Sequence, residues 1–505
     1  MIYRLFVEKR EGYNIPAQKL KADFRDVLSI DVESVRELIR YDVQNMSAED
    51  FEKAKSVVFS EPPCDLIYEE RFVPSEGESV FAVEYLPGQY DQRADSAAQC
   101  VQLLTRKARP LIRCAKVYAI KGADSEQVER IKHYLINPVE SREATLTKPE
   151  SLESDACANY DAPVIEGFCA FSDPEVERYH AEHGFAMSAE DLKWVRDYFR
   201  REGRDPFETE LKVIDTYWSD HCRHTTFLTE LTDVRFSTPN KRIEEAYALY
   251  RELYEEFNAK RTDKYPCLMD VATIGAKKLK KEGCLSDLDE SDEINACSIN
   301  VKAKVDGKER DFVVMFKNET HNHPTEIEPY GGAATCLGGA IRDPLSGRTY
   351  VYQSMRVTGA ADPTVGISET LPGKLPQRVI TKTATGGFSS YGNQIGLATG
   401  MVHEVYHPNF VAKRLETGFV VGAAPKENIY REKPVPGDCI ILLGGDTGRD
   451  GCGGATGSSK AHNAHSVAEC GAEVQKGNPL TERKIQRLFT EKKVTTLIKK
   501  CTDFG

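Results

Sequence analysis

The sequence has 505 residues, more than one ordinary domain holds, and its length suggests about three domains. Its 67 basic and 79 acidic residues give a net charge of −12 without a long Lys/Arg block, which argues against nucleic acid or an anionic membrane as the main partner. No apolar run reaches the length of a membrane span and residues 1–10 lack the apolar core of a signal peptide, so we expect a cytoplasmic protein.

Residues 1–145 alternate strand-like and helix-like patterns, which is typical of an α+β domain. The expected strands are 3–8, 56–59, 79–85 and 112–120, and the expected helices are 96–104 and 125–135, the latter with Asp124 as its N-cap. No catalytic pattern stands out here, so a scaffold or docking role is the favoured interpretation.

A linker is expected at 141–163, where Ser, Glu, Lys, Pro and Ala replace periodic patterns. Helical signals follow at 173–174 and 188–199. A sharper helix start lies at Asp205, with Pro206 at the first position and apolar residues at helical spacing up to Trp218.

That helix leads into WSDHCRH at 218–224. His221 and His224 are three residues apart, so we expect both on one face near the helix C-terminus, where the dipole favours a protonated imidazole. Simple capping of the helix end by both histidines remains the alternative.

Residues 244–258 are predicted to form an amphipathic helix, and the charged segment 277–293 a solvated loop. A strand at 299–305 is expected to pair with 311–316 through the Asp306-Gly307 turn.

The stretch 311–343 carries the densest chemistry in the chain. The apolar run 312–316 predicts a buried strand, and on an extended chain every second residue faces the same side, which groups Lys317, Glu319, His321 and His323. Two Gly-Gly pairs, 331–332 and 338–339, are expected to bracket a loop whose N–H groups approach a phosphate. The stretch therefore suggests a nucleotide and a divalent cation.

The remaining chain shows strand and loop signals. Strands are expected at 349–357, 377–382 and 438–443, a helix at 481–489, and two glycine-rich loops at 384–400 and 444–459. The first loop is either functional or an ordinary connection. Because the sequence stops at Gly505 without a helix to cover the last strand, we expect it to be truncated.

Six motifs occur in a fixed order: WSDHCRH at 218–224, FKNETHNHP at 316–324, GGAATCLGGAIRD at 331–343, SSYGNQIG at 389–396, GRDGCGGAT at 448–456 and VQKGNP at 474–479. Together they closely resemble the long, single-chain phosphoribosylformylglycinamidine synthases, over roughly 205–505. Ordered motifs are far more specific than any one of them.

The resemblance implies an α+β / α/β multidomain fold in four parts. These are a small-subunit-like α+β domain (1–145), a linker and helical connector (146–210), an aminoimidazole-ribonucleotide-synthetase-like N-terminal domain (211–375) and a truncated C-terminal partner domain (376–505). It also implies that strands of the third part join a barrel across a pseudo-dimer. A second synthetase half and a glutaminase domain, both absent from this sequence, would complete the enzyme.

The resemblance further assigns roles to residues. It implies His221 and His321 as catalytic, with His321 the general base; His224, Lys317, Gly332, Gly338, Gly339 and Asp343 for ATP; Thr320, His321, Asn322, His323, Arg342 and Gln475 for the ribonucleotide; and Glu319, Asp343 and Asp503 for Mg²⁺. Cys336-Leu337 departs from the small residues expected there.

The implied reaction converts formylglycinamide ribonucleotide to the amidine with ATP and glutamine-derived ammonia, through an iminophosphate. A structural ADP, bound without turnover, is an alternative for this half, as is another synthetase of the same superfamily or a scaffold role. A zinc or HNH-nuclease interpretation of His321-Asn322-His323 is disfavoured, because the 14 cysteines include no C-x-x-C pair and the chain is acidic.

Overall fold

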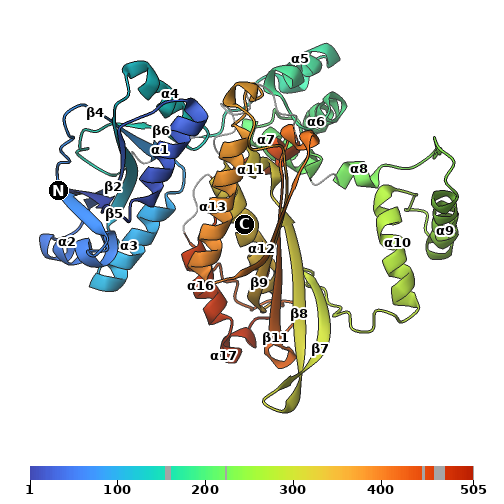
Figure 1. Cartoon of the computed structure of the whole chain (residues 1–505). Helices are drawn as coiled ribbons and strands as arrows, with labels where there is room; N and C mark the ends of the chain where they lie inside the picture. The colour runs from blue at the N-terminus through green and yellow to red at the C-terminus, as the bar shows by residue number, and fades with distance from the viewer. Residues whose placement is uncertain (154–160, 222–223, 446–449, 460–472, 504–505) are drawn as a thin grey trace.

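The computed structural model describes residues 1–153, 161–221, 224–445, 450–459 and 473–503. Its α/β architecture contains two β-sheets, each with helices packed against it (Figure 1). No helix among the described residues is both long and apolar enough to cross a membrane.

The first domain is built on a six-stranded antiparallel sheet in the order β3-β1-β2-β5-β4-β6. Its strands are β1 (Ile2–Lys9), β2 (Ser34–Gln44), β3 (Asp65–Glu69), β4 (Glu78–Tyr85), β5 (Leu111–Lys121) and β6 (Ser141–Ala144). Its helices are α1 (Ile15–Leu28), α2 (Ala48–Ala54), α3 (Gln92–Thr105) and α4 (Ser125–Leu135).

Most of the local predictions for this domain are confirmed, including Asp124 as the N-cap of α4, where its side chain accepts the Gln127 N–H. Two are wrong. Residues 56–59 form a π-helical turn that continues α2 rather than a strand, because Phe59 packs on Tyr41 with ring centroids 5.0 Å apart. The expected linker at 141 begins instead with β6, which pairs with β4.

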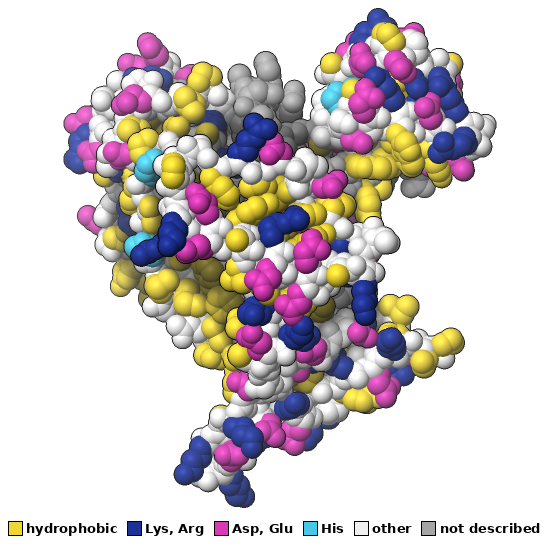
Figure 2. Space-filling view, turned by 90° about the vertical axis from the view of Figure 1, so that its right-hand side faces the viewer, with side chains coloured by type: hydrophobic (Ala, Val, Ile, Leu, Met, Phe, Trp, Pro, Cys, Tyr) yellow, Lys and Arg dark blue, Asp and Glu magenta, His cyan; other side chains and the backbone are white. Residues whose placement is uncertain are grey.

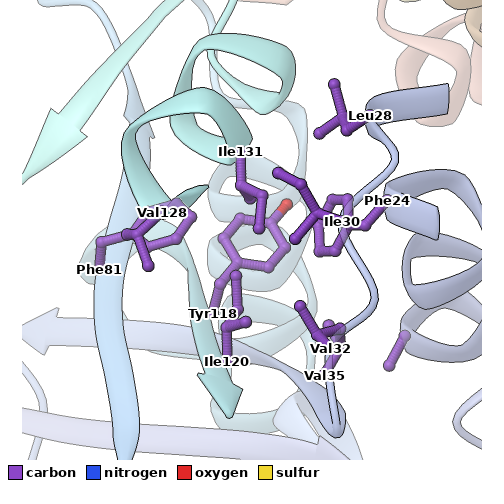
Figure 3. Packing of buried hydrophobic residues seen from close by; sticks show 11 residues of the cluster. Phe24, Leu28, Ile30, Val32, Val35, Phe81, Tyr118, Ile120, Val128 and Ile131 are labelled. Atoms are coloured by element: carbon purple, nitrogen blue, oxygen red, sulfur yellow. The ribbon is translucent and has the colours of Figure 1, made fainter. Parts of the chain in front are cut away.

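The two faces of this sheet are closed differently. Helices α1 and α4 cover one face, and Phe24, Tyr118 and Ile131 meet between helices and strands (Figure 3). On the other face Arg4 is paired with Asp42 at 2.6 Å, and both side chains are 3% exposed. Both faces of the first sheet are therefore buried.

A helical connector follows, formed by α5 (Asp173–His183), α6 (Ala189–Glu202) and α7 (Glu208–Trp218), which share a small apolar core. The predicted cap at Asp205 is wrong: Phe207 is the N-cap of α7, and the Asp205 carboxylate instead accepts the N–H groups of Gly167 and Cys169, both at 2.8 Å.

Three helices, α8 (His224–Leu228), α9 (Lys241–Asn258) and α10 (Leu268–Lys281), form an arm that extends away from the rest of the chain (Figure 1). Helix α9 confirms the prediction at 244–258. The loop expected at 277–293 is wrong in its first turn, because α10 continues to Lys281.

The second sheet has five strands in the order β10-β9-β11-β8-β7. They are β7 (Cys297–Val305), β8 (Lys308–Thr320), β9 (Tyr350–Ala360), β10 (Thr399–Tyr406) and β11 (Leu415–Pro425). The predicted β7–β8 hairpin is confirmed, with Asp306 and Gly307 at positive φ in its turn. Because β10 and β11 join this sheet, it takes strands from both sides of the domain boundary proposed at 375.

Helices α11 (Asn322–Ile327), α12 (Pro329–Ser346), α13 (Gln377–Ile395) and α16 (Pro479–Leu488) pack beside this sheet, with short helices α14 (Gly454–Ser459) and α17 (Lys492–Thr495). The predicted glycine loop at 331–343 is wrong, since these residues lie inside α12. The strand at 377–382 and the loop at 384–400 are wrong too, since most of both lie in α13. Helix α16 confirms the prediction at 481–489.

Close packing explains why glycine-rich segments form helices here. Glycine in a helix costs about 1 kcal/mol relative to alanine. At Gly387 of α13, however, an added Cβ would lie 2.1 Å from the carbonyl oxygen of Tyr330 at the start of α12. The two helices approach each other more closely than any side chain at that position permits.

The strand predicted at 438–443 is also wrong. These residues form no regular structure, and Ile440 is 101% exposed. A strand needs a neighbour for its backbone hydrogen bonds, and no described strand pairs with this segment. The second glycine loop, expected at 444–459, ends in helix α14, and its residues 446–449 lie outside the described residues.

The second sheet leaves one face uncovered. Its pairing register places Ile299, Phe316, Met401 and Val405 on the same face, and each is between 40% and 47% exposed. Hydrophobic side chains also cover broad areas of the side of the molecule that Figure 2 shows. Helices α12 and α13 cover the opposite face.

Candidate functional site

The end of strand β8 and helix α12 bring three predicted site residues together. Lys317 and Glu319 are two apart on the strand and share a face, as predicted, with Nζ and Oε2 3.6 Å apart. Asp343 of α12 reaches the same ammonium group at 3.1 Å. The structure thus unites one cation and two carboxylates from separate motifs.

Burial dominates the electrostatics of this cluster. Burial raises the pKa of both Glu319 and Asp343, and the charge of Lys317 offsets part of this rise in each. The negative charge of Asp343 adds to the rise in the pKa of Glu319. Burial by itself would lower the pKa of Lys317, but the hydrogen bond to Asp343 and the charge of Glu319 outweigh it, so that pKa is raised. Lys317 therefore stays charged and compensates the two acids.

Arg342 precedes Asp343 on α12 and extends the cluster toward the end of the described chain. Its Nε donates to Asp503 Oδ1 at 2.9 Å. The Asp503 charge also contributes to the raised pKa of Asp343, after the larger effect of burial. The three predicted metal-binding carboxylates thus lie in one electrostatic network.

His321 lies just after β8, not on it, because the strand ends at Thr320 and α11 begins at Asn322. Lys317 and Glu319 therefore share one face of the strand, but the prediction that His321 and His323 lie on the same face is wrong. The N–H of His321 donates to the Glu416 carbonyl at 2.9 Å, which anchors the turn.

The ring of His321 is held in one tautomer. Its Nδ1 lies 2.6 Å from the Gly332 carbonyl oxygen, which can only accept, so Nδ1 carries the proton and Nε2 keeps a lone pair. Burial lowers the pKa of His321 to about 4. The ring is neutral at physiological pH, and its Nε2 presents a lone pair.

The other predicted ribonucleotide-binding residues in this turn make structural contacts. His323 Nε2 lies 2.7 Å from Glu473 Oε2, and the Asn322 side chain accepts the Glu416 N–H at 2.8 Å. Thr320 pairs with Thr417 at the end of β8 and its side chain is exposed. These contacts fix the turn that presents His321.

The three predicted nucleotide-binding glycines have different surroundings. An added Cβ would lie 2.4 Å from the Thr325 nitrogen at Gly332 and 2.6 Å from the Tyr391 hydroxyl at Gly338. At Gly339 the nearest neighbours, Glu319 and Arg342, would lie 3.5 Å away. Gly332 and Gly338 are therefore required by helix packing, and Gly339 faces the charged cluster.

Gln475 lies beside α12, because its carbonyl accepts the Thr335 hydroxyl at 2.7 Å. Sequence reasoning missed two buried pairs next to it. Lys476 is bonded to Glu328, and Tyr391 donates to Glu482. Lys476 follows Gln475 in the VQKGNP motif, so the motif could have identified Lys476 as a site residue. No local sequence pattern predicts that Glu482 is buried beside Tyr391.

His221 and His224 lie beyond the end of helix α7, so their predicted place at the C-terminus of that helix is wrong. Helix α7 ends at Trp218, and Asp220 accepts the N–H groups of Thr225 and Thr226, which starts α8 after a break. Burial and the neighbouring His224 lower the pKa of His221. No hydrogen bond or ion pair in the described part of the chain joins either ring to the charged cluster, and Cys222 and Arg223 of this motif lie outside it.

The carboxylates of the cluster have the chemistry that a hard cation requires. Glu319, Asp343 and Asp503 supply oxygen ligands, and burial leaves the first two with raised pKa values that a bound cation would reverse. In the described residues, however, no three such groups converge on one point, because Lys317 and Arg342 occupy the places between them. The three carboxylates have the donor chemistry that magnesium requires, and in this arrangement Lys317 and Arg342 are their partners.

Comparison with known proteins finds similarity over parts of this chain. The model of the formylglycinamide ribonucleotide amidotransferase linker domain matches residues 176–224. Among curated relatives, phosphoribosylformylglycinamidine synthase subunit PurL of Thermoplasma volcanium is 27% identical over 338 residues, which is 66% of this chain and 37% of that protein. The PurL subunit of Methanothermobacter thermautotrophicus is 36% identical over 182 residues, or 36% of this chain and 24% of that protein.

A solved structure of Thermotoga maritima PurL complexed with FGAR is 22% identical, covers 59% of this chain and 37% of that chain, and has a TM-score of 0.36. The chain spans little more than a third of the length of the curated PurL relatives it matches, with 37% for the first and 35% for the next two.

Proposed function

We propose that this chain, which is related over part of its length to the phosphoribosylformylglycinamidine synthases of purine biosynthesis, takes part in their ATP-dependent ligation. The substrate would be formylglycinamide ribonucleotide (FGAR), and ammonia from a glutaminase domain would replace its amide oxygen. The observation that carries the proposal is the cluster of Lys317, Glu319, Arg342 and Asp343 beside a neutral His321.

The reaction assigns a task to each group. The FGAR amide oxygen attacks the γ-phosphorus of ATP, ADP leaves, and ammonia then displaces phosphate from the iminophosphate to give the amidine. Lys317 and Arg342 would offset the phosphoryl charge, and His321 Nε2 would accept the proton lost by nitrogen. Glu319, Asp343 and Asp503 would hold magnesium, which would supply positive charge to stabilise the phosphoryl oxygens.

Other parts of the site stay predictions that the resemblance supports. Thr320, Asn322, His323 and Gln475 would contact FGAR, while His221 and His224 would join the site only if the α7–α8 connection moved toward it. The apolar face of the second sheet would pack against a second synthetase half, as the barrel across a pseudo-dimer requires. A cytoplasmic location also stays a prediction.

Replacing His321 tests the catalytic proposal. His321→Ala should lower ADP release with FGAR, ATP, magnesium and ammonium by about 10²- to 10⁴-fold, because it removes the general base. His133→Ala is the matched control, since His133 is exposed on α4 of the first domain. The assay uses this chain and any longer protein that contains it, and near-normal turnover by His321→Ala would sink the assigned role.

Calorimetry with ATP and magnesium separates turnover from simple binding. Lys317→Ala should weaken binding about tenfold, as expected for a lost charge-assisted contact, while Lys302→Ala on the exposed β7–β8 hairpin should not. Tight binding without hydrolysis would favour the alternative of a nucleotide-binding half that holds ADP structurally. Equal binding by both variants would exclude Lys317 from the nucleotide site.

A further inference from the structure

The segment 473–478, which carries Gln475, is held from two sides by the synthetase-like part of the chain. Thr335 of α12 donates its hydroxyl to the Gln475 carbonyl at 2.7 Å and accepts the Gly477 N–H at 3.1 Å. His323 of α11 contacts Glu473 at 2.7 Å. Both contacts lie on elements that border the charged cluster.

The first domain supplies a third side. Val139, Ile327 and Val474 form a small apolar cluster in which each residue is no more than 2% exposed. The Asn137 side chain donates to the Ile327 carbonyl at 2.9 Å. The first domain thus contacts both the end of α11 and the start of the Gln475 segment, and it lies beside α13 and α16 in Figure 1.

Tyr90 makes the most specific contacts across this interface. Its hydroxyl accepts from Asn478 Nδ2 at 2.8 Å and donates to Asp95 Oδ2 at 2.8 Å. Asn478 Nδ2 also reaches Asp95 at 3.2 Å, which closes a three-membered polar group. The backbone N–H of Tyr90 donates to Asp450 Oδ1 at 3.3 Å.

These contacts enclose the Gln475 side chain between two anchored segments. At Gly451, next to Asp450, an added Cβ would lie 2.6 Å from Gln475 Cγ, and its φ is +87°. Asn478 lies three residues beyond Gln475. Tyr90 therefore contacts both segments beside the Gln475 side chain, at Asp450 in one and at Asn478 in the other.

We propose that the first domain is a positioning element for the substrate site, and that Tyr90 fixes Gln475 by holding Asp450 and Asn478. The inference rests on the proposed function, in which Gln475 contacts the ribonucleotide. Tyr90 touches no substrate itself. Its hydroxyl acts through Asn478. The first domain thus helps to position the substrate site, although it contains none of the predicted catalytic residues.

The variant Tyr90→Phe tests this contact, because it removes the hydroxyl and keeps both the ring and the backbone bond to Asp450. We expect amide hydrogen exchange in the peptide covering 473–479 to become about tenfold faster, as the loss of a hydrogen bond to a partly buried group predicts. The matched control is Asp23→Asn, which breaks a different contact of the first domain, the ion pair with Lys382 of α13 at 2.8 Å. Exchange in the same peptide should stay within about twofold of wild type in that variant.

Kinetics with FGAR and ammonium provide the second readout. In Tyr90→Phe the KM for FGAR should rise about tenfold while kcat stays within about twofold, because a positioning contact acts on substrate binding. Unchanged exchange in Tyr90→Phe, or an equal acceleration in Asp23→Asn, overturns the inference. If exchange is faster in Tyr90→Phe alone but the wild-type protein does not convert FGAR, the positioning contact is supported. The proposed function is then overturned.

Discussion

The two sheets of this chain differ in how their faces are covered. The first sheet has helices on one face and closes the other with buried charge pairs such as Arg4–Asp42. The second sheet has helices on one face and leaves Ile299, Phe316 and Met401 at 40% to 47% exposure on the other. The first sheet is buried on both faces, and the second presents an apolar surface on one of its faces.

The difference shows where each region derives its stability and its chemistry. Exposed apolar side chains gathered on one sheet face mark a surface that a partner covers. The helix-covered side of the second sheet holds buried ionisable groups of its own, among them Glu482 at 5% exposure and Arg356 at 2%. Both regions bury charged groups, and the second also gathers Lys317, Glu319 and Asp343 in one cluster.

The largest expected effect compares one phenylalanine in each region. Phe24→Ala should lower the free energy of unfolding of the first domain by about 3 to 5 kcal/mol, because Phe24 is 0% exposed and leaves a cavity. Phe316→Ala, at 41% exposure, should cost less than about 1 kcal/mol. Native-state hydrogen exchange of β2 and β8 amides measures each region separately, and equal losses would show that the second face is covered after all.

The buried charge pair is the next test. Asp42→Asn should destabilise the first domain by about 3 kcal/mol, because it leaves the guanidinium of Arg4 buried without its counter-charge. The control is Glu309→Gln, whose partner Lys302 is 69% exposed, and it should change stability by less than about 0.5 kcal/mol. Urea unfolding followed by β2 hydrogen exchange reports the difference, which would vanish if the first sheet did not depend on this pair.

Helix packing in the second region allows a third comparison. Gly338→Ala should destabilise that region by about 1 to 3 kcal/mol, because the new methyl group would meet the Tyr391 hydroxyl at 2.6 Å. Gly339→Ala places its methyl group 3.5 Å from its neighbours, and alanine's helix propensity should make it neutral or stabilising by up to about 1 kcal/mol. Thermal unfolding of both variants decides the matter, and a destabilised Gly339→Ala would contradict the assignment.

The smallest expected effect is a pH dependence. Burial raises the pKa of Glu482 from 4.5 to about 8, so between these values the folded chain holds more protons than the unfolded chain. The contribution of Glu482 to the free energy of unfolding therefore falls as the pH rises from about 5 to about 8. Glu482→Gln should flatten that slope in urea unfolding, whereas Glu309→Gln at 68% exposure should keep it. A slope that is unchanged in Glu482→Gln would show that its carboxyl ionises normally.

Local patterns determined several features of this chain correctly. The Asp124 cap, the β7–β8 hairpin with Asp306-Gly307 in its turn, and the shared face of Lys317 and Glu319 all follow from rules that span only a few residues. The six motifs also carry the resemblance to the phosphoribosylformylglycinamidine synthases, because their order along the chain does not depend on how the chain folds.

Tertiary contacts decided the rest. Gly332 and Gly338 read as a phosphate loop, but Thr325 and Tyr391 press against them and α12 forms. The alternation beyond Glu319 failed at His321, because the turn into α11 is anchored by Glu416 of another strand. The contact of Tyr90 with Asn478 joins residues 388 apart in sequence. A local pattern records which conformations a segment permits, and only the neighbours that pack against it select one of them.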